Sequence, residues 1–279
     1  MNVCILRGPR AEQSVIDSAI AALKARGVVG WEARRDGPED TISSGLKGTA
    51  LIVTLGGDGT FLAGGRLAAP KGIPVLGVNL GRLGFLTEVE ADQLESGLTR
   101  FLDGKYRIEE RTILQVSLNR GPRTVAKAIG LNEVVLDHSG EARMLRVEID
   151  VGGQAVGVID ADGVMVSTAT GSTAYALASG GPILEPTLRD LVLVPMNPFA
   201  LTVRPIVFPP GQNISLSVVR GPGEMRIDGG SGQEVQTGDT VRCGAHPRRL
   251  KVVRFSPPEE FYRRLGNKLG WGRPLVPNK

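Results

Sequence analysis

The first third of the chain alternates apolar runs with stretches in which apolar residues recur at helical spacing. Val3–Leu6, Ala50–Leu55 and Ile73–Val78 are almost entirely apolar, as strands buried on both faces are. Glu12–Arg26 and Ala91–Leu102 carry apolar residues at helical spacing, and a glycine follows each of them closely. Strands that alternate with helices predict a mostly parallel sheet with helices on its faces, the α/β class.

The pattern changes near residue 111 to short strands separated by turn residues. The predicted strands include Ile113–Leu118, Val125–Ile129, Glu133–Leu136, Leu145–Val151, Ala155–Ile159, Val164–Ser167, Ile214–Val219 and Val252–Phe255. Strands at this spacing predict an all-β, layered, sandwich-like domain. Ser172–Ala178 and Pro258–Trp271 are expected to be helical.

These patterns predict three parts of the chain. We expect an α/β domain over residues 1–108 and a β-sandwich domain over residues 109–256. Residues 257–279 are expected to form a tail helix that packs back on the first domain.

Composition narrows the function classes. Aromatic residues make up 4% of the chain and no long Lys/Arg run occurs, so we expect no nucleic-acid partner despite a net charge of +4. No apolar stretch reaches the roughly 20 residues of a membrane span, and the N-terminus does not read as a signal peptide. We therefore expect a cytoplasmic protein with no membrane partner.

The cysteines and histidines suggest no catalytic or metal centre. Cys4 and Cys243 stand far apart and are predicted to be small buried hydrophobic residues in a reducing compartment. His138 and His246 lack the neighbours that a metal site or a Ser-His-Asp triad requires. No metal-ligating residue is predicted.

The segment Leu55–Leu62, LGGDGTFL, joins a buried strand to a helix. Gly57 and Gly59 let the backbone approach phosphate oxygens, and Thr60 stands where the helix N-terminus offers further donors. A carboxylate repels anions, so Asp58 fits this turn if it holds a metal ion or takes a proton from an attacking hydroxyl. The alternative is that Asp58 only makes an Asx turn.

Two further segments lie at the ends of predicted strands. The first comes directly after a strand, and the second stands where a strand begins. NLGRLGFL, residues 79–86, would set Phe85 beside the ligand of the first loop, or else Phe85 belongs to the core. In LNEVVL, Asn132 and Glu133 place an amide beside a carboxylate, which can bind two ribose hydroxyls or the edge of a base. A solvated turn is the alternative for this pair.

The segment Asp160–Tyr175, DADGVMVSTATGSTAY, crowds hydroxyl groups into a turn before a helix. Its hydroxyl-bearing turn residues are Thr168, Thr170, Ser172 and Thr173. Hydroxyls, glycine and a helix N-terminus together suit a dinucleotide or phosphate clamp. An elaborate helix N-cap is the alternative, although one capping residue would suffice.

These segments, in this order, resemble the NAD kinase family. The resemblance extends to ASGGPI, to RPIV at Arg204–Val207, to DG at Asp228–Gly229 and to FYRRLGNKLGW near the end. GGDGT also occurs in diacylglycerol-kinase-like and phosphofructokinase-like enzymes, whereas the TGSTAY block is specific to NAD kinases. The resemblance implies transfer of phosphate from ATP, or from polyphosphate, to the adenosine 2′-hydroxyl of NAD. It also implies Mg²⁺ bound with the nucleotide and a homodimer or homotetramer.

The resemblance assigns roles to individual residues. It makes Asp58 catalytic and places Phe85 against the dinucleotide. It also implies that Asn197 of one subunit reaches the nicotinamide end of the dinucleotide that is bound to a neighbouring subunit. The other implied dinucleotide contacts are Asn132, Glu133, Asp162, Thr173, Ala174 and Tyr175. Asp160 stands where some relatives carry a basic residue, which leaves open the choice between NAD and NADH.

Two alternative functions remain at the level of sequence. One is a lipid or sugar hydroxyl kinase built on the same GGDGT loop, and the TGSTAY block disfavours it. The other is a non-catalytic nucleotide sensor, which the presence of Asp58 disfavours. The phosphoryl donor, the assembly size and any feedback by NADP or NADPH stay open.

Overall fold

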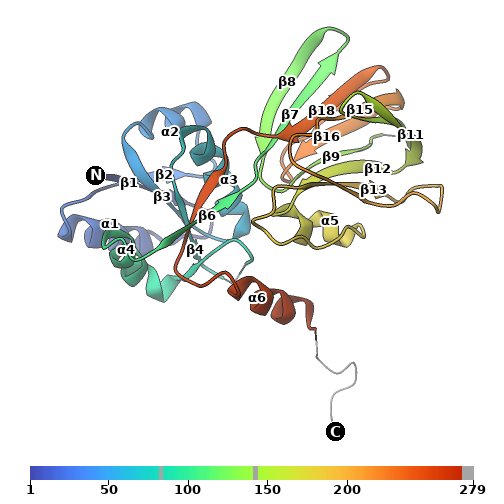
Figure 1. Cartoon of the computed structure of the whole chain (residues 1–279). Helices are drawn as coiled ribbons and strands as arrows, with labels where there is room; N and C mark the ends of the chain where they lie inside the picture. Colours follow the sequence, from blue (N-terminus) through green and yellow to red (C-terminus); the bar gives the residue numbers. More distant parts are fainter. Residues whose placement is uncertain (82–83, 141–143, 272–279) are drawn as a thin grey trace. The chain divides into compact units, whose positions relative to one another are not determined.

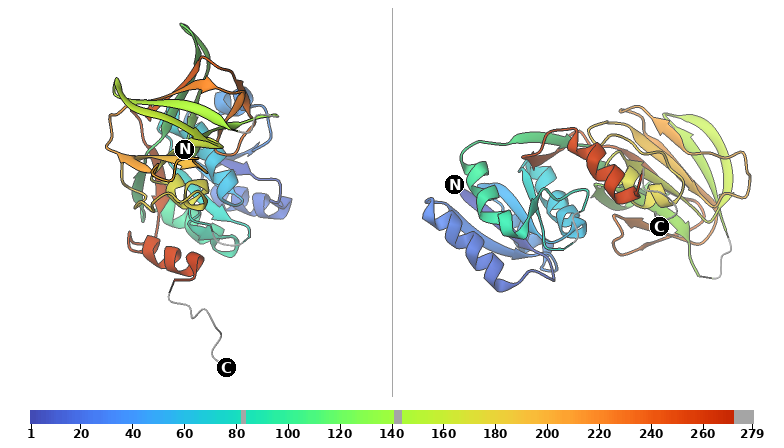
Figure 2. Two further views of the ribbon diagram at one scale, coloured as in Figure 1. Left: turned by 90° about the vertical axis from the view of Figure 1, so that its right-hand side faces the viewer. Right: turned by 90° about the horizontal axis from the view of Figure 1, so that it is seen from below.

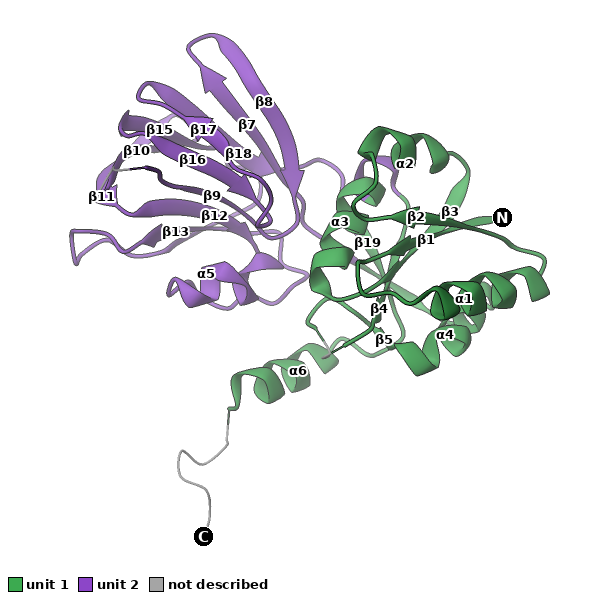
Figure 3. Ribbon diagram, turned by 180° about the vertical axis from the view of Figure 1, so that it is seen from behind, with its two compact units in different colours: residues 1–68, 73–109, 251–279 green, residues 69–72, 110–250 purple. Residues whose placement is uncertain are grey.

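The computed structural model describes residues 1–81, 84–140 and 144–271, which form two compact units (Figure 1). Unit 1 contains residues 1–68, 73–109 and the described residues from 251 onward. Unit 2 contains residues 69–72 and 110–250 (Figure 3).

Unit 1 is built on a seven-stranded sheet with the order β2-β1-β3-β4-β19-β6, and β5 pairs with β4. Pairing is parallel for β1–β2, β1–β3, β3–β4, β4–β5 and β4–β19. The strands are β1 (Asn2–Arg7), β2 (Val29–Arg34), β3 (Thr49–Leu55), β4 (Val75–Asn79), β5 (Val89–Glu90), β6 (Arg107–Arg111) and β19 (Leu250–Arg254). The helices are α1 (Gln13–Ala25), α2 (Glu39–Gly45), α3 (Asp58–Ala68), α4 (Leu94–Leu102) and α6 (Glu260–Leu269), with short 3₁₀ turns η1 (Ala69–Lys71) and η2 (Ala91–Gln93). The predicted α/β class is confirmed.

Alternation along β3 explains why this strand is apolar on both faces. Leu51 and Val53 belong to the core formed with α1 and α4, which lie side by side (Figure 2). Ile52 and Thr54 point to the opposite face, against α3. A Cβ on Gly64 of α3 would lie 2.4 Å from Cγ2 of Thr54, so glycine is needed for the helix to approach the sheet this closely.

Unit 2 contains two six-stranded antiparallel sheets. Their orders are β11-β10-β15-β18-β7-β8 and β14-β13-β12-β9-β16-β17. The first sheet comprises β7 (Leu114–Arg120), β8 (Arg123–Gly130), β10 (Leu145–Val151), β11 (Gln154–Ala161), β15 (Ile214–Arg220) and β18 (Asp239–Ala245). The second comprises β9 (Glu133–His138), β12 (Gly163–Thr168), β13 (Leu191–Met196), β14 (Ile206–Phe208), β16 (Gly223–Ile227) and β17 (Gln233–Val235). One hydrophobic core contains side chains of both sheets, as the predicted sandwich requires.

The second sheet of unit 2 is apolar on both faces. Val164 and Val166 of β12 join the core shared by the two sheets. Met165, between them, packs instead in a smaller cluster with Ala176 of the helix α5 (Tyr175–Ala178). The short helix therefore covers the outer face of the sheet. The helical piece expected over Ser172–Ala178 is present as the 3₁₀ turn η3 (Gly171–Thr173) followed by α5.

The boundary between the two units differs from the one predicted from the sequence, because residues 251–256 belong to unit 1. The sequence pattern placed residues 251–256 in the β-sandwich, whereas β19 pairs in parallel with β4 through Val252 and Val75. Val253 is fully buried in the core of unit 1. A short apolar strand has the same residue pattern in either sheet, so the pattern does not indicate which strand it pairs with.

Both cysteines are buried, as the sequence predicts. Burial raises the pKa of the Cys4 and Cys243 thiols to about 12, because the thiolate would lose its hydration. The two thiols are therefore inert packing groups at neutral pH. Among the described residues, no helix combines the length and the apolar character needed to cross a bilayer.

Candidate active site

Asp58 is the first residue of α3, and its carboxylate is held by the loop that follows β4. The Phe85 amide donates to Oδ2 at 3.0 Å and the Leu86 amide donates to Oδ1 at 3.1 Å. A Cβ on Gly84 would lie 1.9 Å from Oδ1, so the carboxylate reaches this loop only because residue 84 is glycine. These two donors are 27 and 28 residues away in sequence, so the carboxylate does more than the Asx turn that the sequence left open.

The glycine-rich turn before α3 is open at one position and filled at another. Apart from its neighbours along the chain, no described residue lies within 4 Å of the position that a Cβ on Gly57 would take. Next to Gly59 lies the Arg35 guanidinium, with Nη1 3.4 Å from the corresponding Cβ position. Thr60 is buried, and its hydroxyl occupies the space beside Gly56. The turn is thus open beside Gly57, has a positive charge beside Gly59 and is packed internally by Thr60.

Asn132 and Glu133 lie on a turn that is held by Asp228. The Asp228 carboxylate accepts the amides of Leu131 at 3.0 Å, Asn132 at 2.8 Å and Glu133 at 3.3 Å. Asp228 adopts a left-handed backbone conformation (φ 48°), and Gly229 follows it with φ 67°. A side chain that satisfies three amides of one turn fixes the direction of the side chains on that turn.

Glu133 is a buried acid. It is 6% exposed, and its Oε2 has no hydrogen-bond partner among the described residues. Burial, and secondarily the negative charge of Asp228, raise its pKa to about 7. A buried carboxyl oxygen without a hydrogen-bond partner destabilises the folded protein unless a ligand supplies the missing hydrogen bond. The site therefore offers a ligand either an acceptor or, when the group is protonated, a donor.

The TGSTAY turn packs directly on the turn that carries Asn132. A Cβ on Gly171 would lie 2.4 Å from the Asn132 carbonyl oxygen, so glycine permits this contact. The Ser172 hydroxyl donates to the Ala169 carbonyl at 2.7 Å and accepts from the Leu184 amide at 3.0 Å. Part of the hydroxyl cluster therefore stabilises the turn itself.

The residues that follow remain accessible. Thr173 and Ala174 are half-buried, and Tyr175 is exposed at the start of α5. These three accessible residues directly follow Gly171 and Ser172, and Gly171 is the residue that contacts Asn132. The structure brings the NE and TGSTAY segments together within unit 2.

Asp162 and Asn197 form a second pair in unit 2, whereas Asp160 is engaged elsewhere. The Asn197 amide donates to the Asp162 carboxylate at 2.8 Å, and Asn197 has a left-handed backbone (φ 46°). Asp160 pairs with Arg146 at 2.7 Å and with Arg220 at 3.2 Å. The hydrogen bond from Arg146 lowers the pKa of Asp160. Asp160 therefore remains ionised at neutral pH within a surface ion-pair network.

Two residues of the site had no assigned role at the level of sequence. Asp228 was visible only as part of a DG pair, and its partners lie 95 to 97 residues earlier in the chain. Arg35, directly after β2, belongs to an isolated Arg pair that carries no motif. The residues 82–83 of the NLGRLGFL segment lie outside the described residues.

The two amide hydrogen bonds leave the Asp58 carboxylate able to accept a proton, or to contact a metal ion that arrives bound to a nucleotide. Each carboxylate oxygen accepts one amide and keeps a second lone pair. The described residues contain no group of three or more His, Cys, Asp or Glu residues with metal-binding geometry. A parallel α/β unit with this acidic glycine turn, combined with a sandwich unit that presents polar loops, defines a nucleotide-dependent phosphotransferase.

Comparison with known proteins gives the family. The model of the ATP-NAD kinase N-terminal domain matches residues 21–106, and that of the ATP-NAD kinase C-terminal domain matches residues 131–255. The chain is 44% identical over 238 residues to the NAD kinase of Heliobacterium modesticaldum, covering 85% of this chain and 84% of that protein. It is 39% identical over 230 residues to the NAD kinase of Treponema denticola, covering 81% of each. The chain belongs to the NAD kinase family, and its activity is phosphorylation of NAD to NADP.

Solved structures agree with this assignment. The NAD kinase of Archaeoglobus fulgidus, in complex with ATP, has a TM-score of 0.78 at 26% identity and covers 98% of this chain and 100% of its own. Yeast NADH kinase, in complex with NADH, has a TM-score of 0.89 at 23% identity and covers 100% of this chain and 90% of its own. The second likeness is one of fold alone.

Proposed function

We propose that the chain transfers the γ-phosphoryl group of ATP to the 2′-hydroxyl of the adenosine ribose of NAD, with Asp58 as the catalytic base. The observation that carries this proposal is the Asp58 carboxylate, oriented by two backbone amides at the N-terminus of α3. The complex of the Archaeoglobus relative with ATP supports ATP as the donor. Backbone around Gly57 and the charge of Arg35 would bind the phosphates.

In the proposed reaction the bond between O2′ and the γ-phosphorus forms as the bond between that phosphorus and the β,γ-bridging oxygen breaks. The 2′-hydroxyl proton moves to the Asp58 carboxylate, and ADP leaves with the electron pair. Mg²⁺ bound to the triphosphate would offset the charge on the phosphoryl oxygens. The contribution of the protein is to hold the acceptor, the base and the phosphates in line.

The direct test is NADP formation. Purified protein with Mg-ATP and NAD should produce NADP, measured with an NADP-specific dehydrogenase as the coupling enzyme. Parallel assays with polyphosphate and with NADH would define the donor and the acceptor. Turnover of a lipid or hexose, without NADP formation, would show that the acceptor is wrong.

Asn132 is proposed to bind the dinucleotide rather than the triphosphate. Because its turn is held rigidly by Asp228, the amide is preorganised and its loss should weaken ground-state binding. Asn132→Ala should raise the Kd for NAD at least about tenfold and leave the KM for ATP within about twofold. Gln115→Ala, an exposed amide on β7, is the matched control. A larger effect on ATP than on NAD would reverse the assignment of the two substrates.

We further propose a homo-oligomer formed through the segment that follows β13. Phe199 and Leu201 are 79% and 84% exposed, which is unusual for neighbouring apolar side chains. Phe199→Asp would bury an unpaired charge in such an interface and should reduce the mass measured by size-exclusion chromatography with light scattering. Val125→Asp, at an exposed position on β8, is the control. An unchanged mass for the Phe199 variant would place the interface elsewhere.

A further inference from the structure

The loop that orients Asp58 is itself held by the C-terminal part of the chain. Leu86 donates its amide to Asp58, and its carbonyl accepts from Nη1 of Arg254 at 2.9 Å. The next carbonyl, that of Thr87, accepts from Nη1 of Arg264 at 2.6 Å. One side of this short loop therefore faces the proposed base, and the other side is bonded to β19 and α6.

Glu88 joins the same loop to the C-terminal segment by four further contacts. Its Oε1 accepts the amides of Phe255 at 2.7 Å and Ser256 at 2.6 Å, and its Oε2 pairs with Arg254 at 3.1 Å and Arg264 at 3.3 Å. The side chains of Glu88 and Arg254 are only 2% and 4% exposed. Buried charges are tolerated when they are paired and fully hydrogen-bonded, so this arrangement restricts the loop to one conformation.

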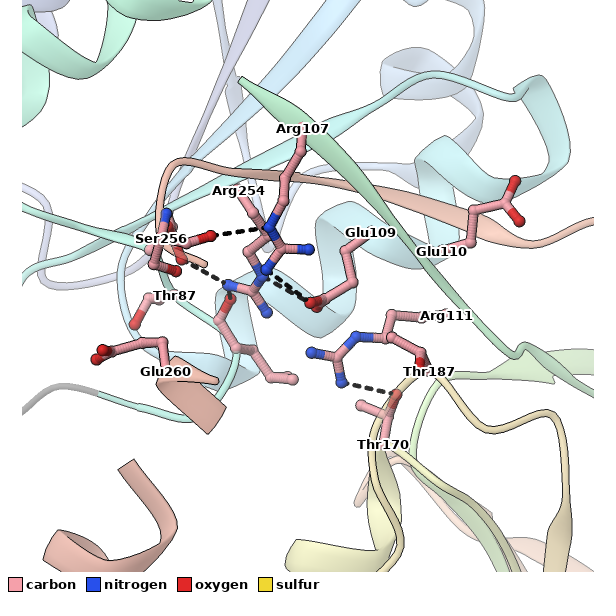
Figure 4. A network of polar contacts seen from close by, with 12 residues as sticks. Thr87, Arg107, Glu109, Glu110, Arg111, Thr170, Thr187, Arg254, Ser256 and Glu260 are labelled. Carbon is pink, nitrogen blue, oxygen red and sulfur yellow. Dashed lines mark hydrogen bonds and ion pairs between the residues drawn. The ribbon is translucent and has the colours of Figure 1, made fainter. Parts of the chain in front are cut away.

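Arg254 also connects the network to β6. Its Nε donates to Glu109 at 3.0 Å, and Figure 4 shows this pair beside Thr87 and Ser256. The Arg254 guanidinium thus compensates two buried carboxylates and one carbonyl. Removing it would leave buried charges without partners, so a variant of Arg254 would report on folding rather than on the loop.

Arg264 offers a milder way to release the loop. It is 10% exposed on α6, near the end of the described chain, and its Nε also donates to Glu260 at 3.3 Å. Without Arg264, Glu88 would keep Arg254 and two amides, so the buried carboxylate would remain compensated. Its neighbour Arg263 pairs with the same Glu260 but is 73% exposed, and among the described residues its hydrogen bonds reach only Glu260.

We propose that Arg264 is a positioning residue for Asp58. The guanidinium fixes the Thr87 carbonyl and Glu88, which sets the direction of the two amides that orient the Asp58 carboxylate. The helix α6 is then part of the catalytic apparatus although none of its residues needs to touch the reacting atoms. This inference rests on the proposed role of Asp58. Because a displacement of about 1 Å can cost up to about 10² in rate, we expect a fall in kcat without a comparable rise in KM.

The test is a double-mutant cycle in the full-length protein. Arg264→Ala should lower kcat for NADP formation about tenfold and change the KM values for NAD and ATP by less than about twofold. In the Asp58→Asn background the same substitution should change kcat by less than about twofold, because the group that Arg264 positions is already absent. Arg264→Lys, which keeps the charge and a donor, should restore part of the loss. Arg263→Ala is the matched control and should behave as wild type.

The outcomes separate this inference from the proposed function. A kcat for Arg264→Ala within twofold of wild type, or equal losses on both backgrounds, would overturn the positioning role while leaving Asp58 as the base. A fully active Asp58→Asn variant would overturn the role of Asp58 and this inference with it. If Arg264→Ala unfolds in thermal melts, the cycle is repeated with Arg264→Met, which keeps the apolar stem of the side chain and removes its donors, and the same criteria apply.

Discussion

Asp58→Asn should lower kcat for NADP formation at least about a hundredfold and change NAD binding by no more than a few-fold. Phosphoryl transfer through a loose transition state needs proton removal only late, so the base supplies part of the catalysis. The usual general-base factor is roughly 10² to 10⁴, which corresponds to about 3 to 5 kcal/mol. The remaining rate would come from alignment of the substrates.

The same substitution has a structural cost that the loop contacts predict. Both Asp58 oxygens accept backbone amides, and Asn can accept through only one of them. The loss of one hydrogen bond should reduce the free energy of unfolding by about 1 kcal/mol, which leaves the fold intact. Circular dichroism and a thermal melt check this, and Asp92→Asn, an exposed change in unit 1, serves as the control. A folded Asp58→Asn variant with activity within a few-fold of wild type would rule out the base.

Glu133→Gln should make the protein more stable than wild type at pH 8 and change its stability much less at pH 5. The pKa of Glu133 is raised to about 7 in the folded protein from 4.5, first by burial and then by Asp228. Between these values the folded state holds a proton that the unfolded chain has lost. Stability that is fully present below pH 4.5 therefore falls as the pH rises to about 7. Gln mimics the protonated acid and removes this fall.

The size of the effect follows from linkage. The raised pKa corresponds to about 3.5 kcal/mol above pH 7 as an upper limit, since one pKa unit is about 1.4 kcal/mol. A gap of a few kcal/mol should appear as a Tm higher by several degrees at pH 8, measured by calorimetry. Glu148→Gln, on the exposed side of β10, should show no such dependence. Equal Tm differences at both pH values would mean that Glu133 is ionised in the folded protein.

Much of the fold followed from local patterns. Apolar runs and helical spacing are set by residues close in sequence, so the parallel α/β sheet and the β-sandwich were both predicted. The glycine turn around Asp58 and the TGSTAY turn were found for the same reason, because turn residues have local conformational preferences. The strand β19 was assigned to the β-sandwich although it belongs to the sheet of unit 1. The apolar pattern of a buried strand does not indicate which sheet the strand joins.

Contacts between polar groups that are far apart in the sequence could not be predicted from the sequence alone. Every residue offers a backbone amide and a carbonyl, so nothing in the chain indicates that Asp228 would bind the turn of Asn132 or that Phe85 would bind Asp58. The same holds for the burial that raises the pKa of Glu133. The sequence by itself determined which carboxylates and glycines the site contains. The tertiary structure decided how they are oriented and charged, because orientation and desolvation depend on neighbours far away along the chain.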